Sequence, residues 1–170
     1  MLKIQDILRA QDIKRWTIVR TVRNQSVAEH TFNVVMIARA IAALAKIDDD
    51  EIIKFALEHD LDEILTGDIP SPTKKRARSI GVDLNKLESK GKHAMPGPEV
   101  RAVVKAADMI ENLWFLVENG VGRHAHEESV LLNDIVDDYL LELNDLSPII
   151  AKSARKVAES VFNGSYFRHE

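Results

Sequence analysis

The sequence predicts an all-α fold, a helical bundle in one domain that spans residues 1–170. Apolar side chains recur at spacings of three and four along most of the chain, which is the period of an amphipathic helix. No run of alternating β-branched residues is long enough to predict a sheet. Helix start and stop signals also bracket several of the periodic segments. A chain of this length can bury one sizeable core.

The first strong helix signal is the sequence SVAE at positions 26–29. It is a capping box, in which the Ser26 side chain accepts a hydrogen bond from a first-turn amide and Glu29 reaches back to the amide of Ser26. We therefore expect a helix over residues 27–46. Its apolar stripe consists of Val27, Val34, Ile37, Ile41 and Ala45.

A second helix is expected to begin at the acidic run 48–51, because carboxylates stabilise the positive N-terminal end of a helix. It should end near His59 or Asp60, with a short helical piece continuing to Leu65. The stretch 58–68 then holds five carboxylates and one histidine but no Lys or Arg. A positive charge from elsewhere is needed to make this arrangement tolerable in a packed segment.

Residues 66–72 should form a loop, since Pro70 and Pro72 lack amide donors and restrict the residues before them. The following segment, 74–97, is polar and interrupted by glycine. This composition predicts one irregular helix followed by a connection.

Three helices are expected in the second half of the chain. Pro98 at a first helical position and Gly120 just past the end frame a long helix. Another should cover residues 126–143, and the last should run through 147–164. We find no internal repeat, low-complexity tract or interdomain linker.

The composition limits the compartment and the kinds of partner. The chain has no cysteine, and its N-terminus lacks a basic-plus-apolar signal peptide, so a cytoplasmic location is expected. No apolar run approaches the roughly 20 residues that span a bilayer, which argues against a membrane protein. A net charge of -4 argues against a nucleic-acid polymer as partner. The basic run 74–78 has no interleaved aromatic residues and does not change this expectation.

His30 lies in the same four-residue row as Val34 and therefore shares the core-facing side of its helix. A lone histidine there is usually a hydrogen-bonded core residue. The adjacent His59 and Asp60 change this interpretation. Neighbours on a helix diverge by about 100°, so both can reach one point only in a groove against other helices. A metal ion is such a point.

Asp108 completes the candidate site from the middle of the long helix, where Ala106 and Ala107 permit close helix approach. An unpaired buried carboxylate there would cost several kcal/mol, a cost that a cation would remove. Two imidazoles and two carboxylates suit Zn, Mn, Fe, Co or Ni and leave coordination positions for water and substrate. The four candidate ligands are His30, His59, Asp60 and Asp108.

Four sequence blocks resemble the HD superfamily of metal-dependent phosphohydrolases. They are RW at 15–16, SVAEH ending at His30, HDLDEILTGDIPSPTK over 59–74, and KAAD ending at Asp108. The blocks are similar to the bacterial 5'-deoxynucleotidases of the YfbR type and to the phage dATP triphosphohydrolases of the DatZ type. The resemblance implies an HD-type helical bundle. It covers roughly residues 15–124 and little of the C-terminal helices.

The resemblance also implies roles for two further carboxylates. It makes Glu63 and Asp68 the residues that orient water and handle protons near the scissile phosphate. Glu63 follows His59 by four residues and Asp60 by three, so it points to the same groove if the helix continues. The competing interpretation of Glu63 and Asp68 is a solvated acidic face.

The substrate-binding residues are expected to be cations for phosphate and apolar groups for the base. Phosphoryl transfer depends on charge neutralisation and positioning, which Arg15, Lys74 and Lys105 could supply. Surface ion pairing is the alternative role for these cations, and core packing is the alternative for Trp16. By resemblance the remaining binding residues are Trp16, Ile18, Ile69, Pro70, Ser71 and Pro72.

The predicted activity is metal-dependent hydrolysis of purine deoxyribonucleotides, foremost dATP to deoxyadenosine and triphosphate. The closer likeness of residues 107–125 to the phage enzymes favours this substrate. The nearest alternative is a 5'-deoxynucleotidase that releases phosphate from dNMPs. An alternative of another class is a non-catalytic nucleotide-binding HD scaffold. A further alternative is a cyclic-nucleotide phosphodiesterase, which usually needs more metal ligands than this sequence offers.

The expected cofactor is one divalent transition metal, with additional Mg²⁺ on the triphosphate as a further option. The expected partner is a small-molecule deoxynucleotide, and the resemblance implies a homo-oligomer, either a hexamer or a dimer. A phage-encoded protein of this kind would work in the host cytoplasm. The remaining histidines receive no role: His93, His124, His126 and His169.

Overall fold

A computed structural model describes residues 3–84 and 95–163. In this part of the chain the only β-structure is two isolated bridges, and the all-α prediction is confirmed. The elements are α1 (Ile4–Ile7), η1 (Leu8–Gln11), α2 (Val27–Ala45), α3 (Asp50–Glu58), α4 (Glu63–Thr66), α5 (Ser71–Ser79), α6 (Pro98–Asn119), α7 (Arg123–Leu146) and α8 (Pro148–Asn163).

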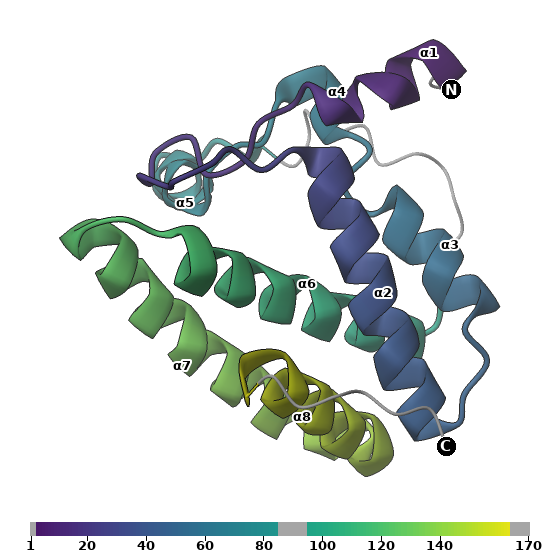
Figure 1. Cartoon of the computed structure of the whole chain (residues 1–170). Coiled ribbons are helices and arrows are strands. Elements are labelled where there is room, and N and C mark those ends of the chain that lie inside the picture. Colours follow the sequence, from purple (N-terminus) through teal and green to yellow (C-terminus); the bar gives the residue numbers. More distant parts are fainter. Residues whose placement is uncertain (1–2, 85–94, 164–170) are drawn as a thin grey trace.

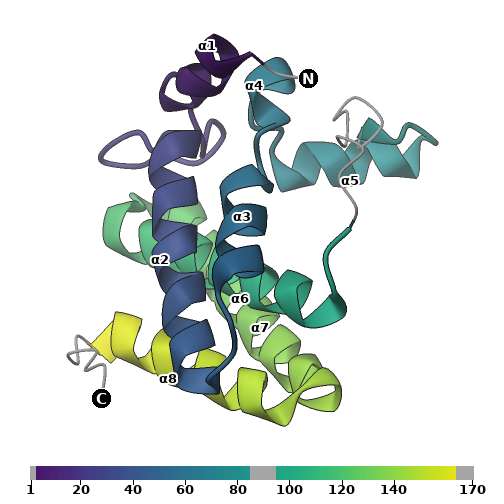
Figure 2. The same cartoon turned by 90° about the vertical axis from the view of Figure 1, so that its right-hand side faces the viewer.

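The longer helices share one hydrophobic core, with α2 at its centre. Helix α2 packs against α3, α6 and α8, while α7 packs against both α6 and α8. Figures 1 and 2 show α3 beside α2 and both helices crossing α6. Small residues on the facing sides, including Ala38, Ala42, Ala106 and Ala107, are fully or almost fully buried and allow the backbones to approach closely. This crossing brings three separate stretches of sequence to one place.

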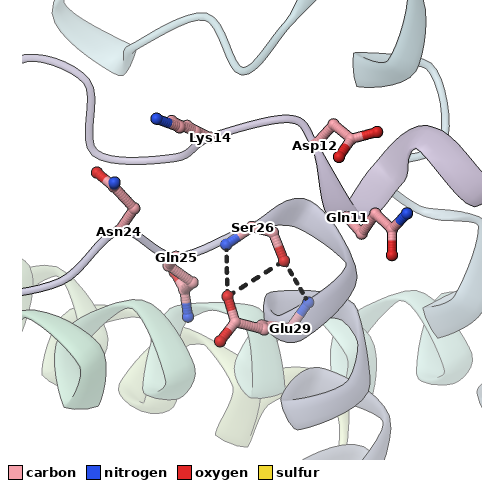
Figure 3. A pocket seen from close by; sticks show the side chains of 7 residues that line it. All are labelled: Gln11, Asp12, Lys14, Asn24, Gln25, Ser26 and Glu29. Atoms are coloured by element: carbon pink, nitrogen blue, oxygen red, sulfur yellow. Dashed lines mark hydrogen bonds between the residues drawn. The ribbon is translucent and has the colours of Figure 1, made fainter.

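The predicted helix 27–46 is confirmed, and so is its capping box. Glu29 N donates to Ser26 Oγ at 3.2 Å, and Ser26 N donates to Glu29 Oε2 at 2.8 Å. Figure 3 shows this pair of reciprocal bonds at the start of the helix. The helix ends at Lys46, whose left-handed backbone (φ 57°) is a common way to stop a helix.

The second predicted helix ends where expected, but the chain then turns instead of continuing as α-helix. Helix α3 stops at Glu58, and residues 59–62 form tight turns before α4. Within them Glu63 N bonds to the Asp60 carbonyl at 3.1 Å, a bond over three residues. The assumption that Glu63 extends the helix of His59 is therefore wrong, and the turn is what carries Glu63 toward the same groove.

The predicted loop 66–72 is shorter than expected. Thr66 ends α4, while Ser71 and Pro72 already belong to α5. A proline is compatible with the first turn of a helix because amides there have no partner within the helix. The helix expected within 74–97 is thus observed at its start, and residues 85–94 of the connection lie outside the described part of the chain.

In the C-terminal half the helix framed by Pro98 and Gly120 is confirmed. Helix α7 is three residues longer at each end than the predicted 126–143, and α8 matches its prediction to within one residue. The short N-terminal elements α1 and η1 were not predicted, because segments of four residues show no recognisable period. Of the unassigned histidines, His93 and His169 lie outside the described residues.

Helix α2 corrects the expectation that no apolar segment is long enough to cross a bilayer. Its 19 residues pass the test for a membrane span by length and composition alone. The core helix of a helical bundle passes the same test, and α2 occupies that position here. Its apolar composition follows from contact with three other helices.

We predict that Ser26→Ala destabilises the protein by about 0.5–2 kcal/mol, because an amide at the start of α2 loses its acceptor. Chemical denaturation measures the change. Ser26→Asn is the matched control, since Asn supplies an equivalent cap acceptor and should retain most of the stability. Equal losses in both variants would contradict the capping role.

Candidate active site

The four predicted metal ligands come together where α2, α6 and the turn after α3 meet. His30 Nε2 lies 3.4 Å from Asp60 Oδ2 and 3.3 Å from Asp108 Oδ1. His59 Nε2 lies 3.3 Å from the same Asp60 oxygen. One ligand atom each from His30, His59 and Asp60 lie within 4.8 Å of one another. Three of the four predicted ligands thus surround a single point, and Asp108 lies beside them in contact with His30.

The imidazole rings are held so that their Nε2 atoms face this point. The other ring nitrogen of His30 contacts Glu111 Oε2 at 2.5 Å, and that of His59 contacts the carbonyl oxygen of Ala56 at 2.7 Å. Both Nε2 atoms are buried, and neither has a hydrogen-bond partner among the described residues. Histidine ligands of metals are typically held in this way by their second nitrogen. The donor set therefore fits a divalent transition metal.

The electrostatics of the cluster indicate a demand for positive charge. Burial lowers the pKa of His30, but the neighbouring carboxylates of Asp108, Asp60 and Glu111 outweigh it and raise the pKa to about 10. Burial also opposes ionisation of Asp60 and Asp108, yet the nearby histidines and Arg15 or Lys105 leave both pKa values lowered. Without a metal, His30 therefore stays protonated, and its positive charge compensates the neighbouring carboxylates.

Glu63 has a carboxylate that differs from the others. Its side chain is 9% exposed, and its Oε2 atom has no hydrogen-bond partner among the described residues, with Arg15 Nη1 4.0 Å away. Burial, and then the negative charges of Asp60 and Asp68, raise the pKa of Glu63 to about 8. Asp68 is thus close enough to act on Glu63, although it is itself partly exposed. A carboxyl of this kind can exchange a proton near neutral pH.

Arg15 lies inside the cluster, as predicted, and binds carboxylate and amide groups there. Its Nη1 donates to Asp60 Oδ2 at 3.0 Å, and its Nη2 donates to Asn112 Oδ1 at 2.6 Å. Asn112 in turn donates to Asp108 Oδ1 at 2.7 Å. A guanidinium is therefore held directly beside two of the candidate ligands.

The two candidate lysines are placed differently. Lys105 Nζ donates to Asp108 Oδ2 at 2.8 Å, and its side chain is 55% exposed. The ion-pair alternative thus describes Lys105 in this structure. Lys74 is partly buried, and its positive charge lowers the pKa of Glu63 in opposition to the burial. Lys74 therefore stands close to the cluster from the side of α5.

The candidate base-binding residues range from partly buried to exposed. Trp16 has a left-handed backbone (φ 60°), stacks on Phe115 at 6.0 Å between ring centroids and donates from Nε1 to Gln25 Oε1 at 3.1 Å. Trp16 thus packs against the core through Phe115, as the alternative interpretation expected, but it is only partly buried. Ile18 is 51% exposed. Ile69 and Pro70 are partly buried, whereas Ser71 and Pro72 are exposed.

Three polar residues that sequence reasoning did not identify also belong to this region. Glu111 and Gln25 are fully buried and bonded to each other, and Asn112 bridges Arg15 and Asp108. Glu111 and Asn112 follow Asp108 by three and four residues, so helical spacing alone could have placed them on its face. No comparable signal marks Gln25, which lies outside any helix.

Two open pockets lie apart from this cluster, and neither is lined by a predicted site residue. One of about 440 Å³ borders the outer side of Gln25 and the start of α2, where Lys14 and Asn24 face one another across the loops (Figure 3). The other, of about 450 Å³, lies between the end of α6 and the start of α7. The cluster of candidate ligands therefore lies outside both of these pockets.

Comparison with known proteins agrees with this geometry. Residues 4–98 match the family model described as 5'-deoxynucleotidase YfbR-like. The dATP triphosphohydrolase of Salmonella phage PMBT28 is 34% identical, with 88% of this chain and 82% of the relative covered. The corresponding enzyme of Acinetobacter phage SH-Ab 15497 is 38% identical, with 70% and 68% covered.

The fold has a counterpart among solved structures. The Cyanophage S-2L HD phosphohydrolase (DatZ), bound to dA and one catalytic Zn²⁺ ion, superposes with a TM-score of 0.78 at 29% identity. The match covers 97% of this chain and 99% of that chain. The chain therefore belongs to the 5'-deoxynucleotidase YfbR-like family and has the fold of an HD phosphohydrolase.

Proposed function

We propose that this chain is a metal-dependent hydrolase that converts dATP to deoxyadenosine and triphosphate. One observation carries the proposal: two buried imidazole Nε2 atoms that have no hydrogen-bond partner in the described part of the chain face the Asp60 carboxylate. The choice of dATP is supported by the relatives, since two phage proteins at 34% and 38% identity are dATP triphosphohydrolases. The S-2L protein, which binds dA, supports a deoxyadenosine product.

The proposed metal ligands are His30, His59, Asp60 and Asp108. A divalent transition metal bound there would polarise a phosphoryl oxygen and lower the pKa of a water molecule. The mixed nitrogen and oxygen set suits Zn, Co, Mn, Ni or Fe, and the catalytic Zn²⁺ of the S-2L protein supports zinc among these. An additional Mg²⁺ on the triphosphate stays a prediction.

Glu63 and Asp68 are the proposed catalytic carboxylates. The Oε2 atom of Glu63 is buried, has no hydrogen-bond partner in residues 3–84 and 95–163, and can hold a proton near neutral pH. A bound cation would lower this pKa and favour the ionised form, which can accept a proton and orient water. The negative charge of Asp68 raises the pKa of Glu63, which supports a role for Asp68 beside it.

The proposed phosphate-binding cations are Arg15, Lys74 and Lys105. Arg15 is held by Asp60 and Asn112, so its guanidinium is positioned beside the ligands before substrate arrives. Lys105 is bonded to Asp108 and would have to bind phosphate without leaving that carboxylate, which its three donors allow. The proposed border of the base consists of Trp16, Ile18, Ile69, Pro70, Ser71 and Pro72.

The second candidate function is that of a 5'-deoxynucleotidase, which the description of the matching family favours. It would use the same ligands and release orthophosphate from dNMPs, whereas the proposed activity releases triphosphate. Product analysis with single divalent ions and all four dNTPs and dNMPs discriminates the two. A non-catalytic scaffold is disfavoured because the four ligands and Glu63 are all present. Cytoplasmic location and homo-oligomerisation remain predictions.

Asp60→Ala is predicted to abolish metal binding and to lower the rate of dATP hydrolysis by at least about 10³-fold. The reason is that Asp60 contacts both histidines of the cluster. Metal content by mass spectrometry and triphosphate release measure the effect. Asp134→Ala, which removes an exposed carboxylate on α7, is the matched control and should behave like the parent. Hydrolysis at the parent rate by metal-free Asp60→Ala protein would refute the proposed activity.

Glu63→Gln should separate proton handling from metal binding. The variant keeps the size of the side chain but cannot accept the proton, so we expect normal metal content and a rate reduced by about 10²- to 10⁴-fold. Metal analysis and single-turnover kinetics on the same preparation test this. An emptied metal site would instead identify Glu63 as a ligand.

Ile18→Ala tests the base pocket. If Ile18 walls the base, its apolar bulk excludes a 2-amino group, and its removal should shift the ratio of kcat/KM for dATP and dGTP by about 1–3 kcal/mol in favour of dGTP. Metal content should stay unchanged. Val22→Ala, an exposed apolar residue of the same loop region, is the control. An unchanged ratio would remove Ile18 from the pocket and weaken the case for dATP.

A further inference from the structure

Glu111 is a buried carboxylate that the proposed reaction does not use. Its side chain is completely inaccessible, one helical turn beyond Asp108 on α6. Three groups contact it: Gln25 Nε2 at 2.6 Å and Asn33 Nδ2 at 2.9 Å on Oε1, and His30 Nδ1 at 2.5 Å on Oε2. A buried carboxyl group is costly unless it is fully hydrogen-bonded, so this network needs an explanation other than core packing.

The hydrogen bonds around Glu111 run in one direction, and Trp16 sets that direction. An indole N–H can only donate, so the atom of Gln25 that faces Trp16 Nε1 at 3.1 Å must be the amide oxygen. The amide nitrogen of Gln25 therefore faces Glu111 and donates to Oε1. The reverse orientation of the Gln25 amide would direct its NH₂ group at the indole N–H and its oxygen at the carboxylate, which is unfavourable at both contacts. Glu111 Oε1 is thus required to accept.

The same logic extends to His30. An ionised Glu111 has acceptors only, so the His30 Nδ1 atom that contacts Oε2 must carry the proton. The proton on Nδ1 leaves the lone pair of the neutral ring on Nε2, which faces Asp60 and Asp108. Only a nitrogen with a free lone pair can bind a metal.

We propose that Glu111 is a positioning residue whose carboxylate fixes His30 in the Nδ1–H form, and that Trp16, by orienting Gln25, fixes Oε1 of Glu111 as the atom that accepts from the Gln25 amide. The proposal rests on the proposed function in one respect, the role of His30 as a metal ligand. It adds a coupling between the metal ligand and Trp16, a residue proposed to border the base. The chain Trp16–Gln25–Glu111–His30 has a donor and an acceptor at every contact.

Glu111→Gln tests the direction of the chain with almost no change in shape. The amide oxygen introduced at position 111 must face the Gln25 and Asn33 donors, which directs its NH₂ group at His30 Nδ1. His30 then has to accept at Nδ1 and carry its proton on Nε2, toward the metal position. Metal affinity should fall about 10- to 100-fold, the range found when the partner of a metal-bound histidine is removed.

A swapped variant should reverse this loss. In Gln25→Glu/Glu111→Gln the carboxylate at position 25 accepts from Trp16 and from the amide at position 111. The amide oxygen at position 111 is then free to accept from His30 Nδ1–H, and Asn33, which is part-buried, can rotate its amide to match. We expect the swap to recover most of the metal affinity. A purely structural role for Glu111 predicts no such recovery, because the swap adds a second substitution to the core.

The experiment uses the full-length protein stripped of metal. Competition with a chromophoric chelator gives the Zn²⁺ affinity, and the visible spectrum of bound Co²⁺ reports the ligand set. Nitrogen-15 NMR of the His30 ring, recorded above the pH at which the ring becomes neutral, shows the proton on Nδ1 in the parent and in the swap but on Nε2 in Glu111→Gln. Glu118→Gln, the same exchange at an exposed site of α6, is the control and should match the parent.

Parent affinity together with an Nδ1 proton in folded Glu111→Gln would overturn the inference, and so would a swap that is no better than the single variant. If the single variant does not fold, a folded, metal-binding swap supports the inference, and an unfolded swap refutes it. Failure of the proposed function looks different: the parent itself would bind neither Zn²⁺ nor Co²⁺ through His30.

Discussion

The burial of several carboxylates at one crossing of helices is the constraint on which the rest of the structure depends. Asp60, Glu63, Asp108 and Glu111 approach one another where water is largely excluded, and their mutual repulsion would unfold the region unless positive charge compensated it. Arg15 and a protonated His30 supply part of that charge in the protein by itself. A divalent cation would supply the remaining positive charge and could also activate water for hydrolysis.

The fold satisfies this constraint in two ways. It brings helices close together, and it holds each histidine ligand by a hydrogen bond to its other ring nitrogen. Alanines on α2 and α6 let these two long helices cross closely. As a result, His30 Nε2 and Asp108 Oδ1 lie 3.3 Å apart. His30 is held by Glu111 and His59 by a backbone carbonyl. Rigid placement of this kind lowers the cost of organising ligands when a metal binds. His30 and Asp108 thus lie on long helices, while the turn 59–62 supplies His59 and Asp60.

The backbone that carries the proposed base-binding residue Trp16 is less regular than the helices that carry the proposed metal ligands His30 and Asp108. Trp16 adopts a left-handed backbone, a conformation that costs about 1–3 kcal/mol and persists only where packing enforces it. Its stacking on Phe115 and its bond to Gln25 provide that enforcement. Ile18 and Pro72, by contrast, are exposed and have freedom to vary. If these residues border the base as proposed, they can vary without disturbing the proposed metal ligands.

The sequence by itself determined the helical class, the long helices and the four candidate ligands, because helix caps, apolar period and costly buried charges are local signals. It also predicted Arg15 and Glu63 near the ligands. Only the tertiary structure decided that the chain turns after Glu58, that Lys105 pairs with Asp108, and that Gln25 joins Trp16 to Glu111. Spacing along a helix shows which residues share a face, but the partner across that face depends on how distant segments pack, and no local pattern records it.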